Sequence, residues 1–307
     1  MPIKIPDSLP ARTVLESENI FVMTQFRAMH QDIRPLKMLI LNLMPTKEVT
    51  ETQILRKLSN TPLQIEIDLL RTISHESHNT DAEHLESFYV SFDEVKDRRY
   101  DGMIITGAPV ENMDYEAVDY WEELCRIMEW TKTNVYCTMH ICWGALAALY
   151  YHYGIPKRSL DEKLFGVFEH RALKKDSPFF RGLDDVFYVP HSRFAYVDRA
   201  DIEGVPELEV MAVSDRAGVF AVKTQDSRRF FITGHPEYDR TTLMQEYLRD
   251  VEKGKDIALP ENYFPGDDPK NEPLCTWRSS AQLMYTNWLN YYVYQTTPYE
   301  ISRVGEE

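Results

Sequence analysis

Residues 134–149 join a strand-like sequence directly to a helix-like one, with Cys142 at the junction. The first half is rich in β-branched, aromatic and sulfur-containing side chains, whereas the half beginning at Trp143 is rich in Ala and Leu, which favour helix. A cysteine at such a turn projects its sulfur above the edge of a sheet, as in a nucleophile elbow. The positive end of the following helix favours a thiolate, and Gly144 leaves room for a substrate. The alternative is a buried structural cysteine, a common role for a free thiol.

A second strand-like segment, residues 228–239, ends in Gly234-His-Pro-Glu237. Pro236 disfavours a helical conformation for His235, and side chains two residues apart in an extended chain point to the same side. His235 and Glu237 can therefore converge, so that the carboxylate orients the imidazole. Together with Cys142 they predict a triad of nucleophile, base and orienting group. The alternative is that His235 only ends a strand and Glu237 is solvated.

The order of elements predicts an α/β fold with a mostly parallel sheet flanked by helices. Strands are predicted at residues 37–44, 63–70, 101–109 and just before Cys142, with helices at 47–60 and 115–132. After Gly182 the pattern changes to closely spaced strands, which predict a mixed or antiparallel extension of the same sheet; these strands lie at 186–190, 208–214, 218–224 and 229–233. Two further helices are predicted at 241–253 and 279–295.

The elbow and the His-Pro-Glu segment resemble the class I glutamine amidotransferase superfamily, whose fold is flavodoxin-like. Along nearly the whole chain, the sequence is similar to the homoserine O-acyltransferases of methionine biosynthesis. The matching segments are Leu41–Pro45 with Lys47, Thr106–Pro109, His140–Gly144, Tyr153–Lys157, Pro190–Arg193, Gly234–Asp239, Trp277–Ser279 and Asn287–Tyr294. The resemblance implies transfer of an acyl group from acyl-CoA to the hydroxyl of L-homoserine through an acyl-cysteine, with ping-pong kinetics.

The resemblance also assigns substrate contacts to Lys163, Ser192 and Arg249. An arginine suits a substrate α-carboxylate because it forms a two-pronged ion pair that lysine cannot imitate, and Ser192 can exchange a hydrogen bond with a hydroxyl or an ammonium. From the local pattern alone, Arg249 is simply a charged residue on an exposed helix face. His191 and Arg193 are possible neighbours of the site.

The loop after the third strand, Thr106-Gly-Ala108, lies where ligands bind in open α/β sheets. In the resembled fold this loop gives a backbone N–H to an oxyanion. We therefore expect the loop at Ala108 and the N–H of Trp143 to stabilise a tetrahedral intermediate, and Lys47 to supply positive charge at the same rim. The alternatives are an ordinary Gly-Pro turn and a solvated lysine at a helix start.

Glu111 bears on the choice of acyl donor. In the resembled family, glutamate at this position goes with acetyl transfer and glycine with succinyl transfer. A distal succinyl carboxylate beside Glu111 would place like charges together in a poorly solvated pocket. The prediction is therefore a homoserine O-acetyltransferase, with succinyl-CoA as the alternative donor. A glutaminase-type amidotransferase is a second alternative, although its elbow has Gly where this chain has His140. A non-enzymatic protein of the same fold would leave the triad unexplained.

Composition limits the remaining possibilities. The chain has 307 residues, 43% of them hydrophobic, a net charge of −15 and a pI near 5.1, which argues against nucleic acid or an anionic membrane as partner. Its four cysteines lack the spacing of a zinc site or a disulfide scaffold. The N-terminal sequence does not read as a signal peptide, and no apolar run approaches the ~20 residues of a membrane helix. We expect a cytoplasmic protein without metal or cofactor, with acetyl-CoA and L-homoserine as substrates. The resemblance implies a homodimer.

Domain organisation is predicted to be simple. Residues 1–35, with prolines at positions 2, 6, 10 and 35, are predicted to form an N-terminal arm. Residues 36–300 are predicted to form a single α/β domain.

Overall fold

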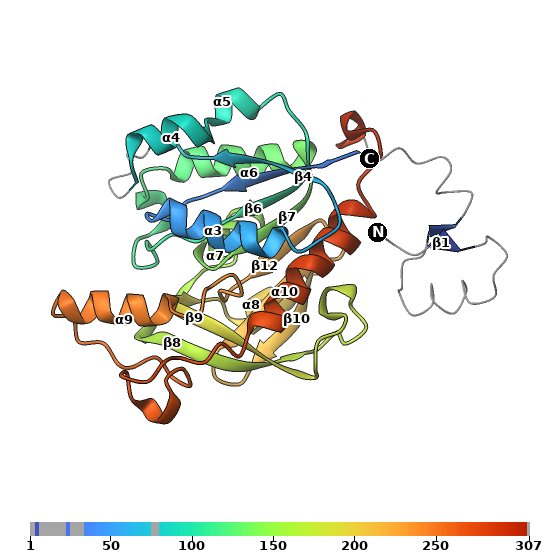
Figure 1. Cartoon of the computed structure of the whole chain (residues 1–307). Helices are drawn as coiled ribbons and strands as arrows, with labels where there is room; N and C mark the ends of the chain where they lie inside the picture. The colour runs from blue at the N-terminus through green and yellow to red at the C-terminus, as the bar shows by residue number, and fades with distance from the viewer. Residues whose placement is uncertain (1–3, 6–22, 25–33, 75–79, 306–307) are drawn as a thin grey trace.

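The computed structural model describes residues 4–5, 23–24, 34–74 and 80–305. A ten-stranded sheet runs through it in the order β5-β4-β3-β6-β7-β12-β11-β10-β8-β9 (Figure 1). The strands from β5 to β12 in this order are parallel: β5 (Tyr89–Val90), β4 (Ile65–Leu70), β3 (Leu36–Leu41), β6 (Tyr100–Ile105), β7 (Val135–Ile141) and β12 (Arg229–Ile232). The remaining strands are antiparallel to their neighbours: β11 (Gly218–Thr224), β10 (Leu208–Ser214), β8 (Arg158–Ala172) and β9 (Val186–Tyr196).

Helices cover both faces of the parallel half (Figure 1). Because side chains alternate along a strand, Met38 and Leu39 of β3 belong to different hydrophobic clusters. The cluster of Met38 includes side chains of α3 (Lys47–Leu58) and α10 (Arg278–Asn287). The cluster of Leu39 includes side chains of α5 (Phe92–Val95), α6 (Trp121–Asn134) and α7 (Trp143–Tyr153). Burial on both sides explains the continuous apolar runs of these strands.

Three shorter or peripheral helices complete the fold: α4 (Ala82–Phe88), α8 (Arg199–Glu203) and α9 (Thr242–Glu252). The predicted helix at 115–132 is in fact a 3-10 turn, Tyr115–Ala117, followed by α6. The predicted helix at 279–295 is α10 continued by a π-helical segment, Trp288–Tyr294. The strands predicted at 208–214 and 218–224 are confirmed as β10 and β11.

The predicted boundary of the antiparallel half was wrong, because that half begins at Arg158 rather than after Gly182. Strand β8 was missed, and β9 extends beyond the predicted end at residue 190 to Tyr196. Strand β8 pairs Ser159 with Ala195 and Leu164 with Arg193, so residues 160–163 form a bulge facing a single residue of β9. The bulge contains Asp161-Glu-Lys163, and this polar run hides the strand pattern.

Lys4–Ile5 (β1) and Met23–Thr24 (β2) pair with each other in parallel. The rest of the predicted arm lies outside the described residues, apart from Arg34 and Pro35. Arg34 forms a two-pronged ion pair with Asp101 of β6, at 2.8 and 2.7 Å, which ties the chain before β3 to the sheet. The division into an arm and one domain stays a prediction.

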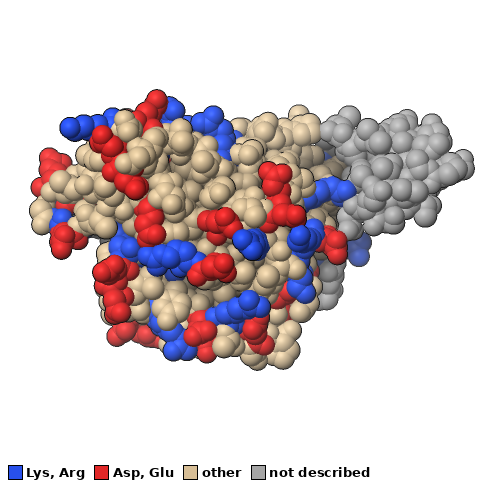
Figure 2. All heavy atoms as spheres, turned by 90° about the horizontal axis from the view of Figure 1, so that it is seen from below, with Lys and Arg blue, Asp and Glu red and all other residues tan. Residues whose placement is uncertain are grey.

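Acidic and basic side chains are interspersed over the face shown in Figure 2 rather than gathered by sign. Within the part of the chain that the structure describes, no helix is both long and apolar enough to cross a membrane.

Candidate active site

Cys142 occupies a strained turn between β7 and α7. Its φ of 50° and ψ of −120° lie outside the regions that L-residues ordinarily adopt. Such a conformation costs about 1–3 kcal/mol and persists only where the surroundings enforce it. Here the Cys142 N–H donates to the Ile232 carbonyl at 2.7 Å, and the Cys142 carbonyl accepts from Ala145 at 2.9 Å. A Cβ on Gly144 would lie 2.5 Å from the Thr106 carbonyl oxygen, so only glycine fits there. The backbone therefore forms the predicted elbow.

His235 and Glu237 follow β12, the strand next to β7 in the sheet. His235 Nδ1 lies 2.7 Å from a Glu237 carboxylate oxygen, and the two residues are only 4% and 5% exposed. The His235 N–H donates to the Pro190 carbonyl at 2.8 Å, which fixes the strand end. Burial alone would lower the pKa of His235, but the neighbouring Cys142 and Glu237 raise it well above its usual value. The structure thus brings the three predicted triad residues together.

Two residues that the sequence did not reveal complete the surroundings of His235. The Tyr238 ring stacks on the imidazole, with centroids 4.1 Å apart and planes 16° from parallel. The Tyr238 hydroxyl donates to Glu246 of α9 at 2.9 Å. Tyr238 lies within the Gly-His-Pro-Glu-Tyr-Asp segment, which offered a signal. Glu246 lies three residues before Arg249, on the same helix face.

Glu246 also joins two of the predicted substrate residues. Ser192 Oγ donates to its carboxylate at 2.5 Å, and Lys163 Nζ lies 3.3 Å from the same oxygen. Arg249 is not part of this group: its side chain is 52% exposed, and its Nε donates to Asp250 at 3.2 Å. Asp250 in turn lies 3.8 Å from Lys163 Nζ. Among the residues that the structure describes, Asp250 is thus the link between Arg249 and the others.

The loop after β6 lies against the elbow. A Cβ on Gly107 would be 3.1 Å from the Cys142 Cβ and 3.4 Å from the backbone nitrogen of Trp143. The first N–H groups of a helix have no partner within it, so the Trp143 N–H at the start of α7 is available to an oxyanion. Ala108, the next residue of the loop, is buried. These positions agree with the expected oxyanion site, whose role stays a prediction.

Glu111 lies in the same loop, and charges of the site affect the pKa of its carboxyl group. Burial raises the pKa of this carboxyl, while a hydrogen bond from its own backbone N–H and the charges of His235 and Lys163 oppose the rise. The charge of Glu246 adds to the rise. A carboxylate solvated on a mobile loop would not have these neighbours.

Lys47 is buried rather than solvated. Its ammonium donates to the Asn42 carbonyl at 2.6 Å, in the turn between β3 and α3. Burial lowers the pKa of Lys47 to about 8, against the raising effect of Glu51. The contacts of Lys47 with described residues are therefore those of a residue that holds a strand end, and its predicted role at the rim of the site stays a prediction.

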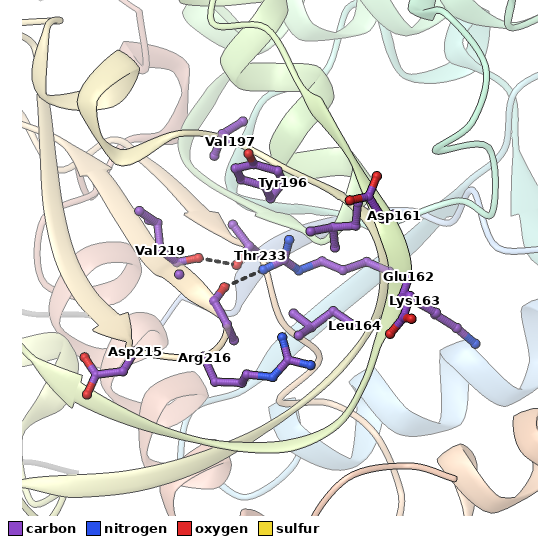
Figure 3. A pocket seen from close by; sticks show the side chains of 14 residues that line it. Asp161, Glu162, Lys163, Leu164, Tyr196, Val197, Asp215, Arg216, Val219 and Thr233 are labelled. Carbon is purple, nitrogen blue, oxygen red and sulfur yellow. Dashed lines mark hydrogen bonds between the residues drawn. The ribbon is translucent and has the colours of Figure 1, made fainter. Parts of the chain in front are cut away.

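A cavity of about 540 Å³ lies inside the antiparallel half (Figure 3). Arg193 lines it and is buried, donating to the Ala195 and Ala217 carbonyls at 2.6 Å each and to His191 at 3.3 Å. Burial lowers the pKa of Arg193 to about 10, while Cys142 and Glu111 oppose this.

One wall of the cavity lies close in sequence to His235. Thr233, two residues before His235, also lines the cavity and donates to the Val219 carbonyl at 2.6 Å. In Figure 3 the Lys163 side chain extends away from Thr233 and Val219. Thr233 thus places one wall of the cavity two residues from His235, although none of the three predicted triad residues lines the cavity.

The family model for homoserine O-succinyltransferase matches residues 2–299. Curated relatives carry the name homoserine O-acetyltransferase. The relative from Petrotoga mobilis is 58% identical over 306 residues, covering 100% of this chain and 99% of its own. The relative from Brevibacillus brevis is 59% identical over 302 residues, covering 98% and 99%. The relative from Geobacillus kaustophilus is 60% identical over 300 residues, covering 98% and 99%.

Solved structures confirm the predicted fold class. A glutamine amidotransferase from Thermotoga maritima superposes with a TM-score of 0.55 at 13% identity, covering 83% of this chain and 97% of its own. A glutamine amidotransferase from Methylobacillus flagellatus gives 0.51 at 10% identity, covering 84% and 95%. The likeness in fold and the match along almost the entire sequence lead to one conclusion: the chain belongs to the homoserine O-succinyltransferase family.

Proposed function

We propose that the protein is a homoserine O-acetyltransferase of methionine biosynthesis. In this proposal it transfers an acetyl group from acetyl-CoA to the hydroxyl of L-homoserine through a thioester on Cys142. The observation that carries the proposal is the strained elbow cysteine beside a buried imidazole that a carboxylate orients. The names of relatives that are 58–60% identical over the full chain support the choice of substrates.

The first half-reaction begins from a protonated His235 beside the sulfur. The Cys142 thiolate attacks the thioester carbonyl carbon, and the backbone N–H groups at Trp143 and Ala108 hold the resulting oxyanion. The bond to the CoA sulfur then breaks, and His235 gives its proton to that sulfur. Acetyl-Cys142, neutral His235 and free CoA result.

In the second half-reaction, neutral His235 accepts the proton of the homoserine hydroxyl. The hydroxyl oxygen attacks the acetyl-Cys142 carbonyl, the Cys142 thiolate leaves, and O-acetylhomoserine is released. Glu237 keeps the imidazole oriented and offsets the charge that it gains. In the same proposal, Lys163, Ser192 and Arg249 bind the amino acid.

Glu111 supports acetyl over succinyl as the transferred group. Glu111 is half-buried, and the charges of His235 and Lys163 act on its carboxyl group, so a second carboxylate in the same pocket would meet its charge in a poorly solvated setting. The family model bears the name of the succinyl reaction, and succinyl-CoA is therefore the alternative donor.

We place the pantetheine arm of the donor in the cavity beside Arg193. A volume of about 540 Å³ suits an extended chain better than a four-carbon amino acid. The lining of Leu164, Val197 and Val219 offers apolar contacts for the methylene and methyl groups of the arm. Val219→Trp should raise the KM for acetyl-CoA and leave the KM for homoserine unchanged. Equal effects on both substrates would remove the arm from this cavity.

A glutaminase activity is the competing proposal, and only the fold favours it. Two residues before the nucleophile this chain has His140, which is buried with Nδ1 3.1 Å from the Phe230 carbonyl oxygen. An assay of CoA release from acetyl-CoA and from succinyl-CoA with homoserine, beside ammonia release from glutamine, separates the candidates. We expect rapid turnover only with acetyl-CoA. Ammonia release without thiol release would overturn the proposal.

The proposal extends to assembly and location. We infer a homodimer from the resemblance, and analytical ultracentrifugation of the purified chain tests it. We also place the protein in the cytoplasm, because all four cysteines are free and free thiols are typical of a reducing compartment. Fractionation of cells that express the tagged protein tests this location.

A further inference from the structure

Lys157 ties the loop of Glu111 to the end of α7. Its ammonium donates to the Glu111 carbonyl at 2.7 Å and to the Met113 carbonyl. It also lies 4.7 Å from the centre of the Tyr115 ring. Lys157 follows the left-handed Gly154 that ends α7 and directly precedes β8. The catalytic mechanism proposed above gives this residue no task.

The other backbone hydrogen bonds around Glu111 are short-range turns. Val110 donates to Ala108 at 2.9 Å, and Met113 donates to Val110 at 3.0 Å. Such turns shape the loop but do not fix it relative to the sheet. The bond from Lys157 to Glu111 instead joins residues 46 positions apart in the sequence. A hydrogen bond from an ammonium is also stronger than a bond between neutral groups.

The far end of the loop is anchored separately. The Tyr115 ring stacks on Trp121 and Tyr150, with centroids 5.1 and 4.6 Å apart. Lys157 lies against the same ring, so it joins the middle of the loop to an aromatic cluster already fixed by α6 and α7. Glu111 is thereby held from its carbonyl side.

Holding the backbone of Glu111 also places its side chain. The Glu111 side chain starts from the backbone that Lys157 holds, so fixing the Glu111 carbonyl restricts where the carboxylate can lie. The charges of His235 and Lys163 act on the Glu111 carboxyl group, and Lys157 holds the Glu111 carbonyl. We propose that Lys157 is a positioning residue that holds Glu111 in the acyl pocket and thereby sharpens the choice of donor. This inference rests on the proposed function.

The test is Lys157→Met, which keeps most of the apolar stem and removes the ammonium. We expect the ratio of kcat/KM for acetyl-CoA to that for succinyl-CoA to fall about tenfold, with the homoserine KM unchanged. The matched control is Lys132→Met. Lys132 also lies over a tyrosine ring, 5.7 Å from the centre of Tyr151, and pairs with Glu129, but it lies on α6 outside the site. Its removal should leave the donor ratio as in the wild type.

A double variant shows whether Lys157 acts through Glu111. In a Glu111→Gly background, Lys157→Met should not change the donor ratio further, because no carboxylate remains to be positioned. A further change of the donor ratio by Lys157→Met in that background, or an unchanged ratio in the Lys157→Met single variant, overturns the inference. If the Met variant does not fold, Lys157→Gln gives the same readout with a polar side chain.

Failure of the proposed function has a different signature. In that case the wild-type protein itself would not transfer acetyl to homoserine. If the wild type is active and Lys157→Met leaves its donor ratio unchanged, only the positioning role of Lys157 is refuted.

Discussion

The parallel and antiparallel halves of the sheet hold their parts of the site by different means. Cys142 and the His235–Glu237 pair follow β7 and β12, adjacent parallel strands, and backbone hydrogen bonds to Ile232 and Pro190 fix their positions. In the antiparallel half, Lys163 lies in the bulge of β8 and Ser192 on β9.

These two side chains meet at the carboxylate of Glu246 rather than through the backbone. Regular geometry thus positions the reacting groups, and a side-chain network positions the groups proposed to bind the amino acid. Changes in the parallel half should therefore lower kcat, whereas changes in the other half should raise KM.

The largest effect should follow from Cys142→Ala. Without the sulfur no acetyl-enzyme forms, and turnover should fall by at least about 10⁴-fold. Mass spectrometry after mixing with acetyl-CoA alone should show one acetyl group on the wild-type peptide that contains Cys142 and none on the variant. Cys125→Ala, on α6, is the control and should still be acetylated at Cys142. Full turnover by Cys142→Ser without a labelled peptide would refute covalent catalysis.

Glu237→Gln should come next, because the amide keeps the shape but neither offsets the imidazolium nor selects its tautomer. We expect kcat to fall about 10²–10³-fold, with the homoserine KM nearly unchanged. Steady-state kinetics at saturating acetyl-CoA measure both quantities. A rise in the homoserine KM at constant kcat would place Glu237 among the substrate contacts. It would also contradict the expected difference between the two halves.

The same contrast explains what the sequence could predict. The elbow at Cys142 and the pairing of His235 with Glu237 depend on residues next to one another in the chain, so local rules of backbone geometry were enough. For Lys47 the sequence predicted the position after a strand. It did not predict the hydrogen bond to the Asn42 carbonyl, because that bond depends on the fold of the turn.

Strand β8 and Glu246 escaped prediction for a common physical reason. The β8 bulge is defined by its register against β9, and Glu246 meets Ser192 at 54 residues of separation. A one-dimensional pattern carries the period of a strand but not its register.

The choice of acyl donor tests whether the loop of Glu111, in the parallel half, affects substrate binding as well as turnover. Glu111→Gly removes both charge and bulk, and should raise the ratio of kcat/KM for succinyl-CoA to that for acetyl-CoA about tenfold to hundredfold. Glu111→Gln removes the charge alone and should give a smaller shift. Identical ratios in the wild type and both variants would place Glu111 outside the acyl pocket.

Lys47 tests whether burying an ammonium group in the parallel half lowers stability. Its pKa is lowered from 10.5 to about 8, so between these values the unfolded chain binds a proton that the folded chain does not. The free energy of unfolding should therefore gain a contribution as pH rises through this window, on the order of 1–3 kcal/mol. Denaturant unfolding at pH 7, 8, 9 and 10 should show this rise relative to Lys47→Met, which lacks the proton. Parallel curves for the two proteins would contradict it.

The smallest effect is expected at Arg249, where the antiparallel side of the site meets α9. Its guanidinium is half exposed and bound to Asp250, so gripping a substrate carboxylate requires it to exchange one carboxylate for another. The net gain from that exchange is modest, and Arg249→Lys should raise the homoserine KM only about tenfold through loss of the two-pronged geometry. The kcat should remain near the wild-type value, because Arg249 touches no reacting atom in the proposed mechanism. Wild-type KM in both Arg249→Lys and Arg249→Ala would remove Arg249 from the site and leave Lys163 and Ser192, joined by Glu246, as the binding residues of this half.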